Sequence, residues 1–574
     1  MLLLRIDESI RPDPDVNFKG DAVTRPGLTD SSRRTRHTGI ERGLANLVDE
    51  LGGRHWGHDY STDSPSSAAL GNRFLTSHYE VRKRRVIAAD QDYSSAMELD
   101  SNACFRAVRA RDRRFDGRFF TAVSSTGIYC RPICPVRPPK RENMRFFSSA
   151  AAAEGAGYRP CLRCRPERAP GLASVDAASR LAGAAIAGIE EHAVSNARVG
   201  DLAASLGVSD RHLRRVTEAE LGVSPIELAQ TQKLLLAKRL LSETSLKLTD
   251  IAFASGFGSV RRFNALFKTR YGLNPRSIRR SGDAVRGLKC LLDFRPPFAW
   301  ESLLAYLRFR AIPGVESVDA THYRRTVAIG EHQGFIAVSL AKGATALEVE
   351  LSPGLAPVIG AVIVRVKNLF DLGATPDAVA DVLSQDPMLA GVVRRLPGLR
   401  VAGAFDGFEL AVRAVLGQQV SVKSATTLAG RWARAFGSPI ATPHAQLDTI
   451  APTAARMCEV TAGEIAALGV VGARARCLVE LAHAAAERRI VLGLAADVEE
   501  QIERLTALPG IGPWTAQYIA MRALRWPDAF PAEDLILLRA AGLGKKELRA
   551  RAEGWRPWRA YATHYLWQSL GVVP

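Results

Sequence analysis

Two close pairs of cysteines constrain the fold of this 574-residue chain more than any other feature. Three residues separate Cys130 from Cys134, two separate Cys161 from Cys164, and a longer loop joins the pairs. Each short pair can bind one side of a tetrahedral ion, so the spacing predicts one Zn²⁺ held by four cysteine ligands. A purely structural zinc ribbon and a pair of disulfides are the alternatives that the spacing leaves open.

Basic residues surround these cysteines. A Zn²⁺ ion with four thiolates carries a net negative charge, so nearby basic side chains can balance it and can also offer a face for DNA phosphates. The residues expected to do so are Arg131, Arg137, Lys140, Arg141, Arg159, Arg163 and Arg165.

The distribution of charge along the chain indicates a nucleic-acid binder. The net charge is +18. Residues 101–170 hold 15 Lys and Arg against 5 Asp and Glu, and residues 171–282 hold 16 against 10. A basic excess confined to one region is typical of a DNA-binding surface, so double-stranded DNA is the expected partner.

Other features favour a cytoplasmic, nucleoid-associated protein. No apolar run approaches the roughly 20 residues that a membrane span needs, so no membrane partner is expected. The four remaining cysteines are scattered singly in the chain and are expected to be reduced, packed thiols. They are Cys104, Cys290, Cys458 and Cys477.

Residues 1–96 lack sustained periodicity and mix Arg, Asp, Ser, Gly and Pro. We expect this segment to be disordered or a spurious N-terminal extension, with a short helix near residues 40–51 as its one candidate element. From Cys104 to Phe120 we expect a basic helix that leads into the cysteine-rich region.

Residues 198–280 contain an internal repeat. Leu202-Ala203 and Ser209 recur as Ile251-Ala252 and Ser259, at offsets of 49 and 50 residues. Each copy reads as a helix, a Gly-bearing turn and a Ser-capped second helix, which is helix-turn-helix geometry, and one long helix is expected between the copies. A helical protein-interaction module is the alternative. Candidate DNA contacts are Arg211, His212, Arg214 and Arg215 in the first copy, and Ser259, Arg261, Arg262 and Asn264 in the second.

The cysteine-rich region resembles the N-terminal domain of the Ada-type adaptive-response proteins, through FFTAVSSTGIYCRPICPVR, RENMRFF and YRPCLRCRP. The resemblance implies a zinc domain over residues 97–170, in which Cys130 is both a metal ligand and the nucleophile that takes a methyl group from a DNA methylphosphotriester. Zinc keeps sulfur deprotonated, and the thiolate is the reactive form. Methylation removes one negative charge, so DNA affinity should rise and a repaired lesion could act as a transcription signal.

The helix-turn-helix repeat resembles the AraC-type DNA-binding domain, which implies such a domain over residues 175–282. An AraC-type regulator implies promoter DNA and RNA polymerase as partners. The second methyltransferase domain of the Ada protein, with its Pro-Cys-His-Arg site, does not occur in this sequence, so O6-methylguanine repair is not expected.

The composition changes from Lys289 onward. Seven of the eight tryptophans lie at or beyond Trp300. Residues 286–370 alternate β-prone segments with helices and predict an α+β subdomain with a small antiparallel sheet, whereas residues 371–574 predict an all-α domain.

The stretch Leu508–Leu524, LPGIGPWTAQYIAMRAL, predicts a helix-hairpin-helix. Gly510 and Gly512 allow backbone N–H groups to approach a DNA phosphate at a helix N-terminus. Asp534 follows 22 residues after Gly512. This pattern resembles the helix-hairpin-helix DNA glycosylases of the 3-methyladenine DNA glycosylase II branch, a resemblance that covers most of residues 289–572.

That resemblance implies Asp534 as the catalytic carboxylate, with Leu535-Ile536 turning back into the core. Trp514 stands where bifunctional relatives place a nucleophilic lysine, so water is the expected nucleophile. Trp514, Tyr518 and Trp567 would stack on electron-poor alkylated bases, although core packing is the alternative for these aromatics. Gln419 stands where some relatives place a leucine wedge and is expected to fill the space left by the flipped base.

The expected fold is therefore multidomain and mainly α, with a zinc-bound α/β domain, two helix-turn-helix motifs, an α+β subdomain and a helix-hairpin-helix domain. The expected function is combined: methyl transfer to Cys130, transcription regulation, and hydrolysis of the N-glycosidic bond of alkylated purines, without a small-molecule cofactor. The alternatives are a transcription regulator whose glycosylase domain is inactive and only binds DNA, and a purely structural zinc-finger protein.

Overall fold

The computed structural model describes residues 100–171, 180–192, 199–206, 208–279, 288–495 and 497–570. The expectations for residues 1–96, including the short helix near residues 40–51, lie outside the described residues.

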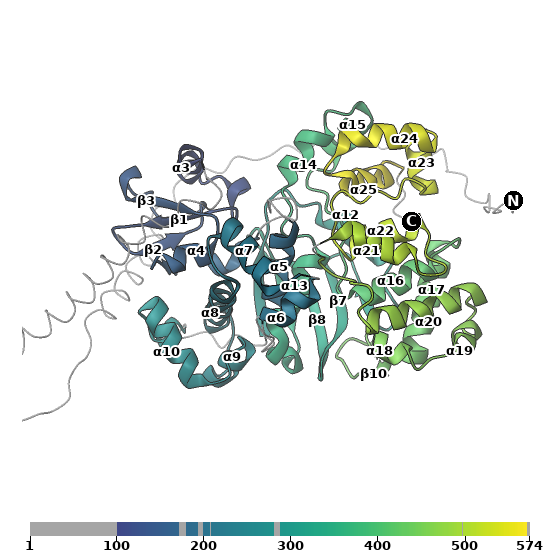
Figure 1. The fold of residues 1–574 in the computed structure, drawn as a ribbon, viewed down its shortest axis with the longest axis horizontal. Coiled ribbons are helices and arrows are strands. Elements are labelled where there is room, and N and C mark those ends of the chain that lie inside the picture. The colour runs from purple at the N-terminus through teal and green to yellow at the C-terminus, as the bar shows by residue number, and fades with distance from the viewer. Residues whose placement is uncertain are drawn as a thin grey trace, which may run out of the picture. The chain divides into compact units, whose positions relative to one another are not determined.

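Residues 100–168 form an α/β unit around a four-stranded sheet (Figure 1). The strands lie in the order β3-β1-β2-β4, and β2 pairs with β4 in parallel so that Tyr129 lies opposite Pro160. This register places the cysteine that ends β2 beside the cysteine that follows β4. The elements are α3 (Ser101–Ala110), η1 (Arg113–Phe115), β1 (Phe120–Val123), β2 (Ile128–Cys130), η2 (Arg141–Asn143), β3 (Met144–Phe147), α4 (Ala150–Gly155), β4 (Arg159–Pro160) and η3 (Pro166–Arg168).

The expected helix from Cys104 to Phe120 is wrong in its extent. Helix α3 ends at Ala110, because Arg111 adopts a left-handed conformation with φ of 50°. Asp112 then caps the short turn η1 by accepting a hydrogen bond from Arg114 N. Phe120 is already the first residue of β1.

The helix-turn-helix repeat is confirmed, and both copies use the same capping residues. Ser209 and Ser259 accept hydrogen bonds from backbone N–H groups in the first turns of α7 and α10. Gly222 and Gly272 end these helices with φ of 70° and 69°, a conformation that glycine adopts without strain. The elements are α5 (Arg180–His192), α6 (Val199–Ser205), α7 (Asp210–Leu221), the long connecting helix α8 (Pro225–Glu243), α9 (Leu248–Ala254), α10 (Val260–Tyr271) and α11 (Pro275–Ile278).

The expected antiparallel sheet of the next region has five strands, in the order β5-β9-β8-β7-β6. Phe263 and Phe267 of α10 belong to the same hydrophobic core as the buried strand residues Val338 and Val349. The second helix-turn-helix is therefore packed against this sheet, although the sequence suggested two separate domains. The elements are β5 (Leu288–Asp293), α12 (Trp300–Arg308), β6 (Glu316–Val318), β7 (His322–Ile329), β8 (His332–Leu340), β9 (Ala346–Leu351) and η4 (Pro353–Val358).

The remainder is helical. Its first helix shares the core of the five-stranded sheet through residues such as Val362 and Val366, and the helices that follow pack around a core that includes Trp432 and Trp555. The prediction of an all-α domain misses one two-stranded ladder, in which Ser438 pairs with Ile450. The strands are β10 (Ser438–Pro439) and β11 (Thr449–Ile450). The helices are α13 (Ile359–Leu369), α14 (Pro376–Leu383), α15 (Pro387–Arg395), α16 (Gly407–Leu416), α17 (Val422–Phe436), α18 (Ala454–Met457), α19 (Ala462–Ala467), α20 (Gly472–Ala486), α21 (Val498–Thr506), α22 (Pro513–Arg522), α23 (Leu535–Ala541), α24 (Lys545–Ala552), η5 (Glu553–Trp555) and α25 (Arg559–Ser569).

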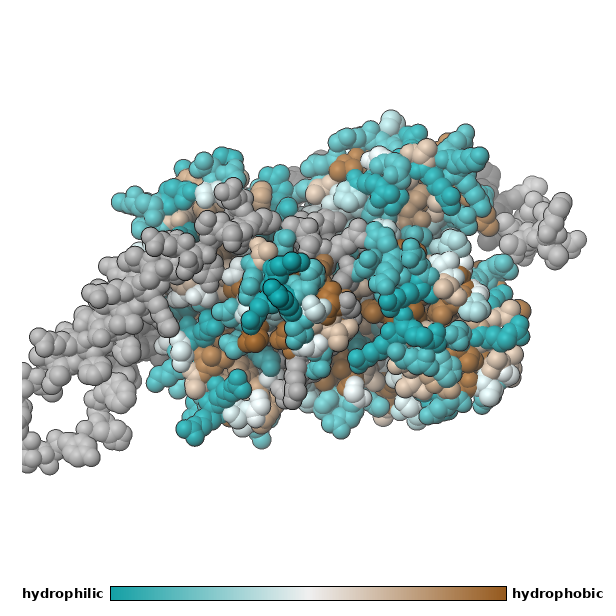
Figure 2. Space-filling view, in the orientation of Figure 1, coloured by the Kyte–Doolittle hydropathy of each residue, from teal (hydrophilic) through white to brown (hydrophobic). Residues whose placement is uncertain are grey.

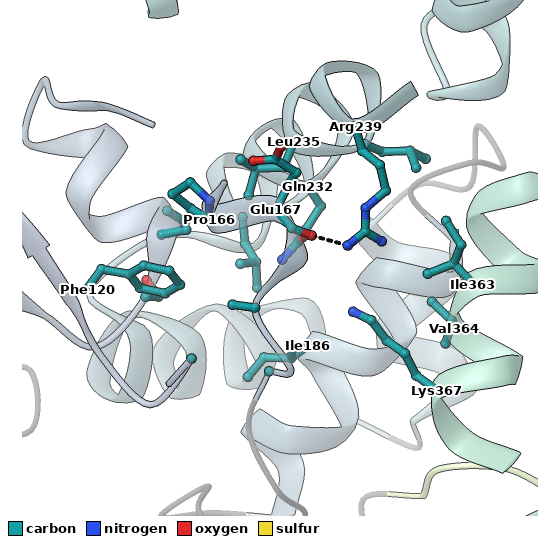
Figure 3. A pocket seen from close by; sticks show the side chains of 18 of the residues that line it. Phe120, Pro166, Glu167, Ile186, Gln232, Leu235, Arg239, Ile363, Val364 and Lys367 are labelled. Atoms are coloured by element: carbon teal, nitrogen blue, oxygen red, sulfur yellow. Dashed lines mark hydrogen bonds between the residues drawn. The ribbon is translucent and has the colours of Figure 1, made fainter. Parts of the chain in front are cut away.

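A cavity of about 140 Å³ lies between the cysteine-rich unit, helix α8 and helix α13 (Figure 3). Its wall combines apolar side chains such as Phe120 and Ile363 with Arg239 and Lys367, which point into it. Arg239 also donates a hydrogen bond to the backbone oxygen of Glu167. Three segments far apart in the sequence thus pack against one another here.

Within the described ranges, no helix is long and apolar enough to cross a membrane. The face of the molecule in Figure 2 is mostly hydrophilic, with apolar residues in small separate patches.

Candidate functional site

The four clustered cysteines come from two strand ends and the turns that follow them. Cys130 ends β2, and Cys161 follows β4 and donates its backbone N–H to Tyr129 O at 2.9 Å. The ligand atoms of Cys130, Cys134, Cys161 and Cys164 all lie within 4.8 Å of one another. This geometry suits one tetrahedral Zn²⁺ with four cysteine ligands.

Two backbone N–H groups stabilise negative charge on the inner sulfurs. Arg131 N donates to Cys164 Sγ at 3.3 Å, and Arg163 N donates to Cys161 Sγ at 3.4 Å. Cys161 and Cys164 are buried, whereas Cys130 and Cys134 are half-buried. A cysteine that reacts with an outside molecule needs an accessible sulfur, and this condition favours the two half-buried thiols.

The expectation that Arg131 and Arg165 offer a phosphate-binding face is wrong. The Arg131 side chain is only 4% exposed and pairs with Asp116 and with Asp293 of β5. Arg165 pairs with Glu167 and with Glu243 of α8. These two arginines join parts of the chain, and the exposed basic side chains near the cluster are Arg137, Lys140 and Arg163.

Helix α21, a tight turn and helix α22 form the expected helix-hairpin-helix. Gly510 has φ of 92°, and a Cβ at this position would lie 3.0 Å from Cys477 Cβ. Gly512 precedes the first residue of α22, and a Cβ there would meet nothing within 4 Å. The N-terminus of α22 is thus open to a phosphate, and only glycine fits the turn at position 510 without strain.

Asp534 is buried and is the N-cap of α23. Its Oδ1 accepts hydrogen bonds from Leu537 N at 2.8 Å and from Trp567 Nε1 at 3.1 Å, and its Oδ2 accepts one from Trp514 Nε1 at 2.9 Å. Three N–H donors therefore fix the orientation of this carboxylate.

The neighbouring carboxylate differs in its surroundings. The side chain of Glu533 is 37% exposed, and its Oε1 lies 3.7 Å from Lys545 Nζ and 3.5 Å from Arg549 Nη2. Asp534 lines a cavity of about 400 Å³, whereas Glu533 does not line it.

Aromatic rings form much of the wall of this cavity, which we call the aromatic cavity. Trp514 stacks on Tyr518 with ring centroids 5.4 Å apart and an interplanar angle of 14°. Tyr306 and Trp567 are nearly parallel, with centroids 6.4 Å apart. All four residues line the cavity. Parallel rings around a cavity of this size can hold a flat, electron-poor ligand by stacking.

Cationic side chains lie against two tyrosines of the aromatic cavity. Burial acts to raise the pKa of Tyr518, but the charges of Arg522 and Arg310 and a hydrogen bond from Arg522 Nη1 at 2.9 Å lower it overall. The Arg310 guanidinium lies 3.9 Å from the ring centroid of Tyr306. The aromatic cavity thus combines stacking surfaces with cationic side chains.

Family models match most of the described chain. Residues 103–167 match the metal binding domain of Ada, and residues 202–281 match a helix-turn-helix domain. Residues 289–406 match the AlkA N-terminal domain, and residues 412–544 match the HhH-GPD superfamily of base excision DNA repair proteins.

Individual proteins are similar to this chain over longer stretches. The probable bifunctional transcriptional activator/DNA repair enzyme AlkA of Mycobacterium tuberculosis is 40% identical over 487 residues, which are 83% of this chain and 97% of that protein. The chain belongs to this AlkA family. DNA-3-methyladenine glycosylase 2 of Escherichia coli is 36% identical over 289 residues, 49% of this chain and 98% of that protein. The solved methyl phosphotriester repair domain of Escherichia coli Ada is 45% identical, covering 13% of this chain and 79% of that one, with a TM-score of 0.12.

The candidate DNA contacts of this AlkA-family chain lie mostly on exposed helix faces. Arg211, Arg214, Arg215, Arg261 and Arg262 are exposed on α7 and α10. Ser259 is exposed and caps α10, whereas Asn264 is half-buried with its Oδ1 inside the fold.

Gln419 is exposed and has a left-handed backbone, with φ of 53°. It lies between Gly417 and Val420, which line the aromatic cavity. Its neighbour Gln418 donates to Gly510 O at 2.8 Å and so joins this loop to the hairpin.

The expectation that Leu535 and Ile536 turn into the core is wrong. Leu535 is 76% exposed and Ile536 is 39% exposed. Because Asp534 caps α23, the first two residues of that helix point outward beside the aromatic cavity, and Leu537 is the first buried one.

Sequence reasoning missed most residues of the aromatic cavity, and the aromatic or ionisable ones among them are Tyr306, Arg310, Arg413 and His564. They come from α12, the residues after it, α16 and α25, and no short motif contains them. The spacing of Trp567 and His564 on α25 was the only available signal, since residues three apart share a helix face.

Proposed function

We propose that this chain is a three-part alkylation-damage response protein that takes up methyl groups, regulates transcription and excises damaged bases. The proposal rests on one observation above others: a four-thiol cluster with an accessible Cys130 and an aromatic cavity lined by Asp534 occur in one chain. The proposed domains are residues 97–170, 175–282, 286–370 and 371–574.

The excision reaction is hydrolysis of the N-glycosidic bond of alkylated purines such as 3-methyladenine. A damaged base leaves the duplex and stacks among Trp514, Tyr518 and Trp567. As the bond to the base breaks, positive charge develops on the sugar, and the Asp534 carboxylate stabilises it. Water attacks the sugar carbon, since Trp514 offers no amine that could form a Schiff base.

Methyl transfer takes place at Cys130. The Cys130 thiolate attacks the methyl carbon of a DNA methylphosphotriester, the carbon–oxygen bond breaks, and the electron pair returns to the phosphate as a diester anion. When bound, Zn²⁺ keeps the four sulfurs deprotonated. The hydrogen bonds from Arg131 N and Arg163 N stabilise Cys164 and Cys161, the two buried sulfurs, and so favour reaction at the half-buried pair. Within that pair, the resemblance to the Ada-type domain assigns the reaction to Cys130.

Regulation follows from the charge change at Cys130. Methylation removes one negative charge, which should raise affinity for promoter DNA. The arginines of α7 and α10 are the proposed major-groove contacts, Gly510 and Gly512 the proposed phosphate contacts, and Gln419 the proposed plug for the emptied base position. RNA polymerase would be the partner of an activator of this kind, in the cytoplasm and at the nucleoid.

The test uses the intact chain with methylated duplex DNA. Intact mass reports a gain of one methylene group, and strand cleavage after alkali reports abasic sites. A protein that gains mass without releasing bases would favour the alternative, a transcription regulator whose glycosylase domain only binds DNA.

A further inference from the structure

Two residues that line the aromatic cavity each carry a buried nitrogen atom without a hydrogen-bond partner. The two atoms are His564 Nε2 and Arg413 Nε. The two residues come from α25 and α16, which are far apart in sequence. A buried polar group without a partner destabilises the fold, so its presence beside a cavity points to a ligand that supplies the partner.

His564 is held in a fixed position inside the fold. It is 3% exposed, and its ring centroid lies 5.0 Å from those of both Tyr306 and Trp567. Burial, followed by the positive charges of Arg522 and Arg310, lowers the pKa of His564 well below its usual range. The imidazole is therefore neutral at neutral pH, with one N–H donor and one nitrogen acceptor.

Arg413 is held in a similar way. Its Nη2 donates to Thr426 Oγ1 at 2.9 Å, which fixes the guanidinium while its Nε has no partner.

Cationic and uncharged bases would be bound in this cavity by different interactions. A cationic base gains attraction to the stacked rings, and its positive charge makes it a good leaving group. An uncharged base has neither advantage, and it also avoids repulsion from Arg310 and Arg413. Stacking alone then distinguishes it little from other bases, and hydrogen bonds can supply the selectivity. His564 Nε2 and Arg413 Nε are buried side-chain nitrogens of lining residues that have no partner.

We propose that His564 is a specificity-determining residue, which together with Arg413 forms a hydrogen-bonding subsite for the edge of uncharged damaged bases. This inference rests on the proposed excision function of the same cavity. It assigns to His564 a role in substrate selection that differs from the role of Asp534 in bond cleavage.

The test compares two lesions in the same duplex sequence, measured by single-turnover excision with the full-length chain. Hypoxanthine is the uncharged probe, and 7-methylguanine is the cationic one. In His564→Leu, excision of hypoxanthine should fall about tenfold or more, the effect of losing one buried hydrogen bond, whereas excision of 7-methylguanine should change by less than about twofold. His564→Gln, which keeps a hydrogen-bonding group, should recover part of the hypoxanthine activity.

A matched control is His483→Leu, since His483 is 41% exposed on α20 and lies beside Glu487. This variant should change neither rate. The proposal is overturned if His564→Leu lowers both rates equally, which would indicate a structural role, if it changes neither, or if the wild type does not excise hypoxanthine. If the wild type does not excise 7-methylguanine, that result would instead contradict the proposed function itself.

Discussion

The indole of Trp567 donates a hydrogen bond to Asp534 Oδ1 across 3.1 Å, so the aromatic wall of the cavity and the carboxylate form one unit. Trp514 completes this unit by donating to Oδ2 at 2.9 Å. The same two indoles line the aromatic cavity and hold the carboxylate. In the proposed function, base binding and charge stabilisation would therefore depend on the same two side chains.

Asp534→Asn should abolish most base excision. The amide keeps the shape of the side chain but removes the charge that stabilises the developing cation on the sugar, a loss of about 10²–10³-fold or more. Release of 3-methyladenine from methylated DNA measures this rate. Glu533→Gln is the control and should retain activity, because Glu533 lies beside Lys545 and Arg549 outside the cavity. If Glu533→Gln is inactive and Asp534→Asn is active, the catalytic carboxylate is Glu533 and the assignment to Asp534 is wrong.

Cys130→Ala should prevent methyl uptake and leave base excision nearly unchanged. Cys134 is also half-buried, and so the variant tests which accessible thiol reacts. Peptide mass mapping after incubation with methylated DNA gives the modified residue, and metal analysis reports any weakening of zinc binding, since one ligand is lost. Cys104→Ala, which removes a buried thiol outside the cluster, should still gain the methyl group. Methylation of Cys134 in Cys130→Ala would show that the nucleophile is wrongly assigned.

The buried carboxyl group of Glu154 should make the stability of the folded chain depend on pH. Tyr129 and Tyr271 donate to its Oε1 at 3.0 and 3.1 Å, which joins β2 to α10. Burial raises the pKa of Glu154 to about 7 from an ordinary value of 4.5, against the opposing effect of these hydrogen bonds. The folded state thus binds more protons between these pH values. The stabilising contribution of Glu154 to the folded state is complete below pH 4.5 and is lost as the pH rises through about 7.

The measurement is thermal unfolding of the full-length chain between pH 5.5 and 8. Glu154→Gln, whose amide oxygen can still accept from both tyrosines, should remove a pH-dependent contribution of up to about 3 kcal/mol and flatten the profile. Glu142→Gln is the control, because that side chain is 73% exposed. A wild-type slope that persists in Glu154→Gln would contradict the assignment.

Asp293 joins the zinc domain to the glycosylase sheet, and its removal should loosen that junction. Arg131 Nη1 donates to its Oδ2 at 2.8 Å, and Arg168 Nη2 donates to its Oδ1 at 2.5 Å. Asp293→Ala leaves two largely buried guanidinium groups with less compensation, which should cost about 2 kcal/mol or more of unfolding free energy. Calorimetry measures this cost. Glu142→Gln, which removes an exposed pairing with Lys140, should cost less than about 0.5 kcal/mol.

The sequence predicted the elements whose residues are close together in the chain. The cysteine pairs, the capped repeat and the glycines of the hairpin each depend on local spacing, and the structure contains all three. Burial of Arg131 could not be predicted, because its partners Asp116 and Asp293 lie 15 and 162 residues away. The exposure of Leu535 was missed for a related reason: an apolar residue is expected inside a fold, and only the capping role of Asp534 turns it outward.

Contacts between distant parts of the sequence also limited the prediction of the aromatic cavity. Its tryptophans could be predicted from one resemblance, but Tyr306 and His564 belong to helices that meet only in three dimensions. Their contact is a consequence of packing α12 against α25, and no local pattern encodes it.

The most direct test of the account measures both activities on one sample of intact protein mixed with methylated duplex DNA. Intact mass gives methyl uptake, and alkali-induced strand cleavage gives abasic sites. We predict that wild type shows both, that Cys130→Ala loses only the mass gain, and that Asp534→Asn loses only the abasic sites. Loss of both activities in either single variant, or absence of either activity in the wild type, would contradict the claim that one chain carries two separate chemical centres.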